Sequence, residues 1–173
     1  MRGHDLEKAF EAYSDELFRH ASLRLKDRER AVELTQECFL RAFEYVKGGG
    51  VIEQVRPFLY RTLRNLIIDE YRRKKSVSLE AMAEAGEDRS VETLLPADET
   101  NTLTAAIERY DGKRALQLVQ SLPDTYKEVL LLRFVEGLTP REIGEIVGES
   151  ENAVSVRIHR GLKKLKDLFE QPQ

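Results

Sequence analysis

The chain has 173 residues, a formal net charge of -3 and a pI near 5.8. Its single cysteine, Cys38, excludes an internal disulfide, and no Cys/His cluster has zinc spacing. No apolar run reaches the length of a membrane span, and neither a phosphate-binding glycine loop nor a nucleophile–base constellation is present. We therefore expect a soluble cytoplasmic protein that is not an enzyme, holds no metal or cofactor and has no stable membrane insertion.

Charge is distributed unevenly along the chain. Residues 55–75 carry seven basic and two acidic side chains, whereas residues 76–112 carry two basic and nine acidic ones. Local charge decides where a polyanion binds, so the acidic total does not exclude a nucleic-acid partner.

The first two predicted helices are amphipathic and cover residues 6–25 and 29–46. The first has apolar residues at three- and four-residue spacing: Phe10, Tyr13, Leu17, Phe18 and Ala21. The second has one apolar stripe, broadened by Phe39 and Phe43: Ala31, Leu34, Cys38, Ala42 and Tyr45. Cys38 is therefore predicted to be a buried structural thiol. Three consecutive glycines, 48–50, must interrupt the second helix, because each costs about 1 kcal/mol relative to alanine.

A third helix is predicted from Pro57 to Lys75. Its buried stripe consists of Leu59, Leu63, Leu66, Ile67 and Tyr71. The macrodipole favours cations at a helix C-terminus and explains part of the basic run 72–75. It does not explain Arg61 and Arg64, which favour contact with phosphate. Phe58 and Tyr60 leave two interpretations open, a place in the core or stacking on unpaired bases.

Periodicity fades over residues 76–104, which are acidic and are interrupted by Gly86 and Pro96, as in a mobile linker. Helical patterns resume over 103–122 and 124–135, and two further helices follow. The sequence predicts an all-α protein of two small helical domains joined by a flexible acidic linker. The expected boundaries are a three-helix N-terminal domain at 1–75, the linker at 76–104 and a four-helix C-terminal domain at 105–173.

The last two helices have the layout of a helix-turn-helix. Thr139, Pro140 and Glu142 form a start signal, with a hydroxyl N-cap, proline at the first helical position and a capping-box carboxylate. Gly148 supplies the residue that tolerates positive φ and ends the first helix. Ser150 can cap the second helix.

The second of these helices has two distinct faces. Its apolar face should pack against the preceding helix and consists of Val154, Ile158, Leu162 and Leu165. The rest of the helix surface carries Ser155, Val156, Arg157, His159, Arg160, Lys163 and Lys164, and no acid occurs between residues 152 and 166. A merely solvated basic face is the alternative. Val156 favours DNA, because an outward apolar residue suits a thymine methyl, while arginines reach guanine edges or phosphates.

Three motifs in this order resemble the bacterial sigma factors of RNA polymerase, in their smallest, extracytoplasmic-function (ECF) form. They are ELTQECFLRAF at 33–43, VRPFLYRTLRNLIIDEYRRKK at 55–75, and the stretch 122–165 that contains the helix-turn-helix. The resemblance implies a region 2 domain, a region 4 domain and a subunit that directs promoter-specific transcription initiation. It also implies core RNA polymerase, through its beta-prime clamp helices and beta flap, promoter DNA and an anti-sigma factor as partners.

The resemblance assigns three sets of binding residues. The polymerase-binding set is Glu33, Gln36, Glu37, Leu40 and Arg41. The set for the melted -10 element is Arg61, Arg64, Asn65, Arg72, Arg73 and Lys75, with the loop 50–55 completing a pocket for one extruded base, since a flipped base must be held by contacts that offset its unstacking. The set for the duplex -35 element is Ser155, Val156, Arg157, His159, Arg160, Lys163 and Lys164.

Two departures from the family pattern stand out. Val32 precedes Glu33 where the family commonly has an acidic pair, and the loop GGGVIEQ is rich in glycine, which leaves the flipped base open. The alternatives are a free-standing dimeric DNA-binding regulator and an RNA-binding or structural adaptor. A regulator needs a sensor or dimerisation module in the first 75 residues, and no heptad seam occurs there.

Overall fold

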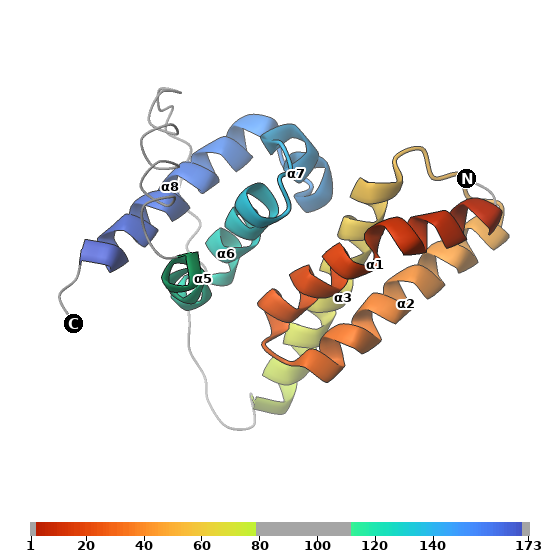
Figure 1. Cartoon of the computed structure of the whole chain (residues 1–173), viewed down its shortest axis with the longest axis horizontal. Coiled ribbons are helices and arrows are strands. Elements are labelled where there is room, and N and C mark those ends of the chain that lie inside the picture. Colours follow the sequence, from red (N-terminus) through yellow and green to blue (C-terminus); the bar gives the residue numbers. More distant parts are fainter. Residues whose placement is uncertain (1–2, 79–111, 171–173) are drawn as a thin grey trace. The chain divides into compact units, whose positions relative to one another are not determined.

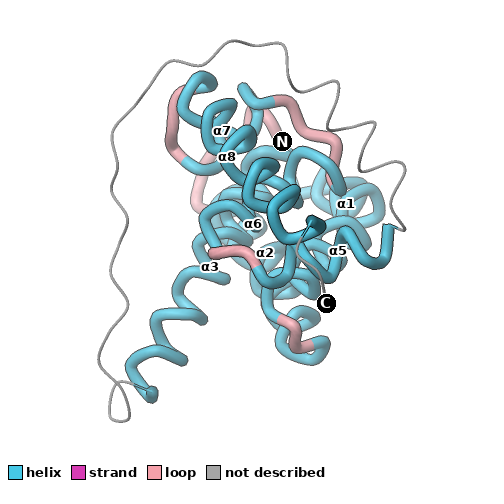
Figure 2. The backbone as a smooth tube through the Cα atoms, turned by 90° about the vertical axis from the view of Figure 1, so that its left-hand side faces the viewer, coloured by secondary structure: helices cyan, strands magenta, loops and turns pink. Residues whose placement is uncertain are grey.

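The computed structural model describes residues 3–78 and 112–170, and its regular structure within those ranges is entirely helical (Figures 1 and 2). The described residues divide into an N-terminal unit of helices α1 to α3 and a C-terminal unit of helices α5 to α8. The predicted all-α, two-domain fold is confirmed. Most of the linker predicted at 76–104 lies outside the described residues, as does the first part of the helix predicted at 103–122.

The N-terminal unit is a bundle in which each helix packs against the other two. Its helices are α1 (Gly3–Leu25), α2 (Arg28–Lys47) and α3 (Val55–Ser78). Asp27 caps α2, because its carboxylate accepts a hydrogen bond from the backbone N–H of Arg30 at 3.0 Å. Helix α3 continues three residues past the predicted end at Lys75, because no glycine or proline interrupts it between positions 76 and 78.

The core of this unit follows the predicted stripes in α2 and α3. Ten side chains from these stripes and from α1 are buried: Leu17, Ala21, Ala31, Leu34, Cys38, Ala42, Leu59, Leu63, Leu66 and Ile67. Burial of Phe10, Phe43 and Tyr45 was a wrong prediction, since Phe10 is 50% exposed and Tyr45 is 49% exposed. The buried face of α1 runs through Leu6 and Ala9 instead. Tyr45 sits in the last turn of α2, where its ring lies against Gly50 of the following loop and against Phe58 at the start of α3.

Two ion pairs join the three helices across their interfaces. Arg56 of α3 donates two hydrogen bonds to the carboxylate of Glu16 in α1, at 2.8 and 3.1 Å. Arg30 of α2 donates to Glu70 of α3 at 2.8 Å. The Glu70 side chain is 2% exposed, so this second pair lies at the edge of the core.

The C-terminal unit consists of α5 (Gly112–Ser121), α6 (Asp124–Leu130), a π-helical turn (Leu131–Val135), α7 (Pro140–Val147) and α8 (Glu151–Glu170). The single helix predicted at 124–135 widens after Leu130, where the N–H of Glu136 bonds to the carbonyl of Leu131 at 3.1 Å. The run 129–132 is buried on all sides. The apolar face of α8 is buried as predicted, but its main partner is α6 rather than α7, with Gly161 lying against Leu130.

Candidate nucleic-acid interface

The turn between α7 and α8 has the predicted helix-turn-helix geometry. Thr139 and Glu142 form the capping box: the Thr139 N–H donates to the Glu142 carboxylate at 2.8 Å, and the Glu142 N–H donates to the Thr139 hydroxyl at 3.3 Å. Gly148 ends α7 with φ of 77°. Ser150 caps α8 by accepting from the N–H of Ala153 at 3.1 Å.

Gly144 makes this turn possible, a role that was not predicted from the sequence. Its carbonyl accepts hydrogen bonds from Gly148 at 2.8 Å and from Glu149 at 3.0 Å. A Cβ at position 144 would lie 2.6 Å from the carbonyl oxygen of Glu149, so the turn closes directly over the glycine. The angle at which α8 leaves the turn therefore depends on residue 144.

Helix α8 presents the predicted -35 residues at its surface in different degrees. Ser155, Lys163 and Lys164 are exposed, and the other four members of the set are half-buried. The hydroxyl of Ser155 donates to the carbonyl of Glu151 at 2.9 Å, which leaves its lone pairs as the acceptors for a ligand. The ammonium of Lys164 lies 5.4 Å from the centre of the Tyr126 ring, a cation–π contact with α6.

Arg157 has an intramolecular partner that sequence reasoning missed. Its guanidinium forms an ion pair with Glu149, which lies in the turn before α8. Both side chains are partly exposed, at 24% and 30%. The pair holds the Arg157 guanidinium against the turn that precedes α8, so any DNA contact by this arginine competes with Glu149.

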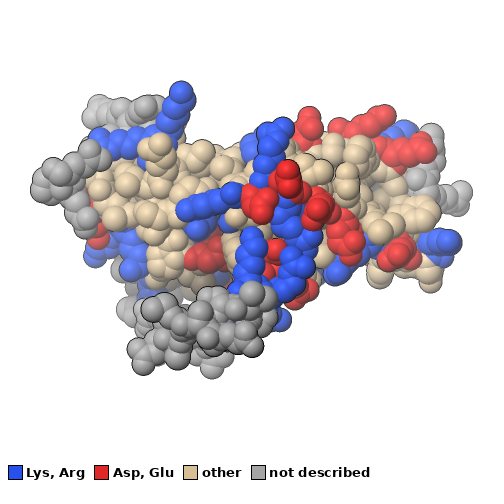
Figure 3. Space-filling view, turned by 90° about the horizontal axis from the view of Figure 1, so that it is seen from below, with Lys and Arg blue, Asp and Glu red and all other residues tan. Residues whose placement is uncertain are grey.

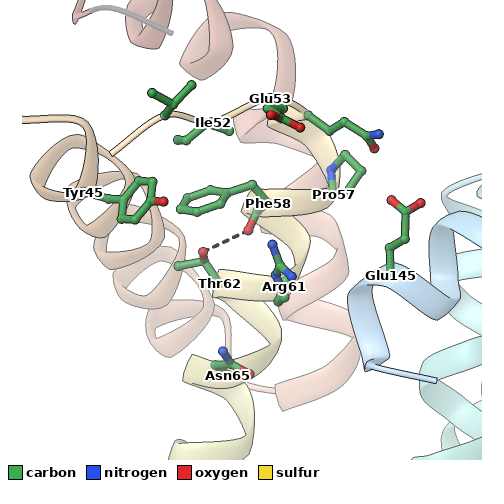
Figure 4. Close-up of a pocket in the computed structure, with 11 residues that line it drawn as sticks. Tyr45, Ile52, Glu53, Pro57, Phe58, Arg61, Thr62, Asn65 and Glu145 are labelled. Atoms are coloured by element: carbon green, nitrogen blue, oxygen red, sulfur yellow. Dashed lines mark hydrogen bonds between the residues drawn. The ribbon is translucent and has the colours of Figure 1, made fainter. Parts of the chain in front are cut away.

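The N-terminal unit has a pocket where the α2–α3 loop meets the start of α3 (Figure 4). In this unit it is lined by loop residues 51–54 and by Tyr45, Pro57, Phe58, Arg61, Thr62 and Asn65. The predicted loop, Arg61 and Asn65 therefore do come together. Tyr60 is 1% exposed and belongs to the core. Phe58 lines the pocket at intermediate burial, and its stacking on an unpaired base stays a prediction.

The remaining -10 residues do not line this pocket. Arg64 is half-buried and precedes Asn65 in the chain. Arg72, Arg73 and Lys75 lie towards the C-terminal end of α3, about 10 to 15 Å along the helix from Asn65 at 1.5 Å per residue. All three are exposed, and Arg73 donates to the Glu70 carboxylate at 3.0 Å. The pocket and the basic end of α3 are therefore two separate places along the helix. The pocket suits a base, and the basic end suits the phosphates of a strand.

Glu70 connects the basic end of α3 to α2. Burial by itself raises the pKa of the Glu70 carboxyl, but the hydrogen bonds from Arg30 and Arg73 together outweigh burial, so the pKa lies below its ordinary value. The carboxylate therefore stays charged and holds both arginines. Arg30 also pairs with Glu33 of the predicted polymerase-binding set.

That polymerase-binding set lies together along the outer surface of α2. Glu33, Gln36, Leu40 and Arg41 are exposed and Glu37 is half-buried; Leu40 is 51% exposed, and Arg41 pairs with Glu37 at 2.9 Å. Val32 and Phe43 are also exposed on this helix. The surface combines apolar and charged side chains, a composition that suits a protein partner.

One face of the molecule carries charges of both signs. On the face drawn in Figure 3, lysine and arginine side chains lie among aspartate and glutamate side chains. Within residues 3–78 and 112–170, no group of acidic, histidine or cysteine side chains could hold a metal ion. No helix in the same ranges is long and apolar enough to cross a membrane.

Comparison with known proteins gives a consistent result over both units. The Sigma-70 region 2 family matches residues 9–77, and the Sigma-70 region 4 family matches residues 113–165. The ECF RNA polymerase sigma factor SigW of Bacillus subtilis is 30% identical over 161 residues, covering 90% of this chain and 86% of SigW. The ECF sigma factor SigE of Mycolicibacterium smegmatis is 31% identical over 159 residues, covering 91% of this chain and 58% of SigE.

The fold also matches a solved structure. Sigma factor RpoE of Bartonella quintana, solved in complex with the anti-sigma factor NepR, superposes with a TM-score of 0.71 at 15% identity. The match covers 98% of this chain and 99% of RpoE, and at this identity it supports the fold alone.

Proposed function

This chain belongs to the ECF family of RNA polymerase sigma factors, and we propose that it binds core polymerase through α2 and promoter DNA through α3 and α8. Its role is then to select promoters and help to open them, with no catalysis of its own. In this proposal region 4 reads the duplex -35 element and region 2 holds the melted -10 strand.

The observation that carries the proposal is that one chain has two different DNA-binding features, one suited to duplex DNA and one suited to an unpaired strand. The C-terminal unit has a capped helix-turn-helix whose second helix carries cations and no acid between residues 152 and 166, as a major-groove helix requires. The N-terminal unit has an aromatic and polar pocket on a helix that ends in cations, as an unpaired strand requires. A free-standing regulator has no use for the second feature.

The test is transcription by reconstituted holoenzyme from a library of randomised promoter duplexes, followed by sequencing of the active templates. We expect two enriched motifs separated by about one and a half to two turns of duplex, at about 10 base pairs per turn. Binding of duplexes without polymerase, and no transcripts with it, would instead identify a free-standing regulator.

Arg160 is the sharpest single test of the -35 assignment. Arg160→Ala should weaken binding of the selected -35 duplex by about 1–3 kcal/mol if the guanidinium contacts a base edge. The matched control is Lys166→Ala, which removes a cation from the same helix outside the proposed set. An equal loss on all duplex sequences would assign Arg160 to phosphate instead.

The polymerase assignment is tested separately on α2. Leu40→Asp places a charge at the centre of the proposed contact and should abolish co-elution with core polymerase, because an unpaired charge buried in an interface is costly. Binding of the -35 duplex should be unchanged. Glu44→Ala, an exposed change on the same helix outside the set, is the control.

We also propose control by an anti-sigma factor, the class of partner present in the RpoE complex. The exposed apolar side chains Val32, Leu40 and Phe43 on α2 support this, since such a surface is usually covered by a partner. A specific binder from the native cell should displace core polymerase and should lose affinity for Leu40→Asp. Recovery of polymerase with no second specific binder would refute this part of the proposal.

A further inference from the structure

We infer, on the premise of the proposed function, that Tyr45 supplies the stacking surface for one unpaired base of the -10 strand and that Gly50 seats this ring. Tyr45 does not belong to the -10 set assigned by resemblance, and Gly50 was assigned there only as the first residue of the pocket loop 50–55. Tyr45 comes from the last turn of α2, and Gly50 is the last glycine of the loop that follows.

Tyr45 and Phe58 form a two-ring wall at the pocket. Their centroids are 5.3 Å apart and their planes are tilted by 37°, so the rings support each other. Figure 4 shows both rings beside the start of α3, above Thr62 and Asn65. Tyr45 remains 49% exposed, which leaves apolar ring surface available to a ligand.

The pocket draws its aromatic surface from the two helices alone. Loop residues 48–54 read GGGVIEQ and contain no aromatic side chain. Tyr45 and Phe58 are the two aromatic side chains among the described residues that line the pocket. If a base is stacked here, these rings must provide the stacking energy, and Tyr45 is the more exposed of the two.

Gly50 leaves room for the Tyr45 ring, because it has no side chain at this position. Its N–H donates to the Tyr45 carbonyl at 2.9 Å, which folds the loop back over the end of α2. A Cβ at position 50 would lie 2.6 Å from two atoms of the Tyr45 ring, Cδ1 and Cζ. Any side chain there would therefore push the ring out of its present place.

Polar groups around the rings provide the means to read a base edge. Asn65 is exposed at the pocket and carries both a donor and an acceptor, and Arg61 is exposed one turn before it. Thr62 lies between them, with its hydroxyl donating to the Phe58 carbonyl at 2.9 Å. A stacking wall beside a mixed donor and acceptor edge is what recognition of a flipped base requires.

The experiment uses holoenzyme reconstituted from the full chain and core polymerase, on the promoter selected from the library. 2-Aminopurine at successive -10 positions reports unstacking by its fluorescence, and polymerase co-elution and -35 duplex binding are measured in parallel. Tyr45→Ala should reduce opening about tenfold or more, the effect of one lost base–aromatic stack. Tyr45→Phe should stay within about twofold of wild type, since the ring is kept. Gly50→Ala should reduce opening in the same direction as Tyr45→Ala.

Phe10→Ala is the matched control, because Phe10 is 50% exposed and also contacts one ring, that of Phe39 at 4.9 Å. It should open the promoter as wild type does. Equal opening by Tyr45→Ala and wild type would overturn the inference while leaving the proposed function intact, and so would a Tyr45→Phe defect as large as that of Tyr45→Ala. If the wild-type chain forms no holoenzyme, the proposed function fails and the inference fails with it.

Discussion

The two units of this protein are stabilised in different ways. The N-terminal unit depends on contacts between residues far apart in the chain, with ion pairs from Arg56 to Glu16 and from Arg30 to Glu70, each 40 residues apart. The C-terminal unit depends on local backbone features, the capping box at Thr139 and the glycine turn, together with apolar packing of α8 on α6. Loss of Glu70 or protonation of His20 should therefore destabilise region 2, and loss of the Thr139 cap should destabilise region 4.

The largest expected effect tests the charge dependence of the N-terminal unit. Glu70→Ala removes a carboxylate that is 2% exposed and leaves Arg30 at 27% exposure without its interhelical partner. We expect the free energy of unfolding of this unit to fall by about 3 kcal/mol, the lower end for a broken buried pair. Urea unfolding followed by circular dichroism measures it.

Glu33→Ala is the control for this experiment, because Glu33 is the exposed partner of the same arginine. It should cost less than about 1 kcal/mol. Equal losses from the two substitutions would show that the buried pair has no special role and would remove the contrast between the units.

A second test uses pH and the buried His20. Burial, and then the nearby charges of Arg24 and Arg19, lower the pKa of His20 to about 3. The unfolded chain binds this proton near pH 6.5, so the stabilisation is present above pH 6.5 and is lost as pH falls towards 3. Between pH 7.5 and 5.5 the N-terminal unit should lose about 1.4 kcal/mol of unfolding free energy.

His20→Leu should remove most of this pH dependence between pH 5.5 and 7.5. Glu70 does not interfere in this window, because a carboxyl with a lowered pKa loses its stabilisation only below its unfolded pKa of about 4.5. The measurement is the urea midpoint at each pH. A slope that persists in the variant would mean that another group titrates.

The capping box gives the corresponding test in the C-terminal unit. Thr139→Ala removes the hydroxyl that accepts from the Glu142 N–H and should cost about 1 kcal/mol. The loss should appear in hydrogen exchange of α7 and α8, while α1 to α3 keep their protection. Thr139→Ser keeps the cap and is the control; a loss in both units would contradict their independence.

The smallest expected effect concerns the ion pair between Arg157 and Glu149 at the helix-turn-helix. Glu149→Gln frees Arg157 and should strengthen -35 duplex binding about twofold, since partly exposed pairs contribute about 0.5 kcal/mol. Glu170→Gln, which also removes one negative charge from this unit, is the control for a general charge effect. Weaker binding by Glu149→Gln would show that the pair positions Arg157 for DNA rather than competing with it.

Helix caps and turns could be predicted from the sequence better than the residues that line the pocket. Thr139, Gly148 and Ser150 act on neighbours within four residues, so their roles could be predicted from spacing alone. Tyr45 belongs to the apolar stripe of α2 by periodicity, yet it is exposed because the helix ends beside a loop. Periodicity assigns a residue to a helix face but does not say what lies opposite.

The partners of the charged residues could not be predicted from the sequence either, because the pattern does not show what lies opposite a side chain. Basic residues read alike whether they are free for DNA or held by an acid, as Arg157 is by Glu149 and Arg73 by Glu70. The Arg30–Glu70 pair spans 40 residues and depends on how α2 and α3 cross. A search for acids within one turn of each predicted DNA-binding cation could have found the Arg73 pair and not the others.

Cys38 can report on the opening of the N-terminal helix bundle. The thiol is fully buried and lies 3.3 Å from the carbonyl oxygen of Leu59, and burial raises its pKa to about 12. The reactive thiolate is therefore almost absent in the folded protein. Cysteines introduced elsewhere can be labelled with maleimide dyes without removing the native one, and slow modification of Cys38 itself times the opening of the bundle.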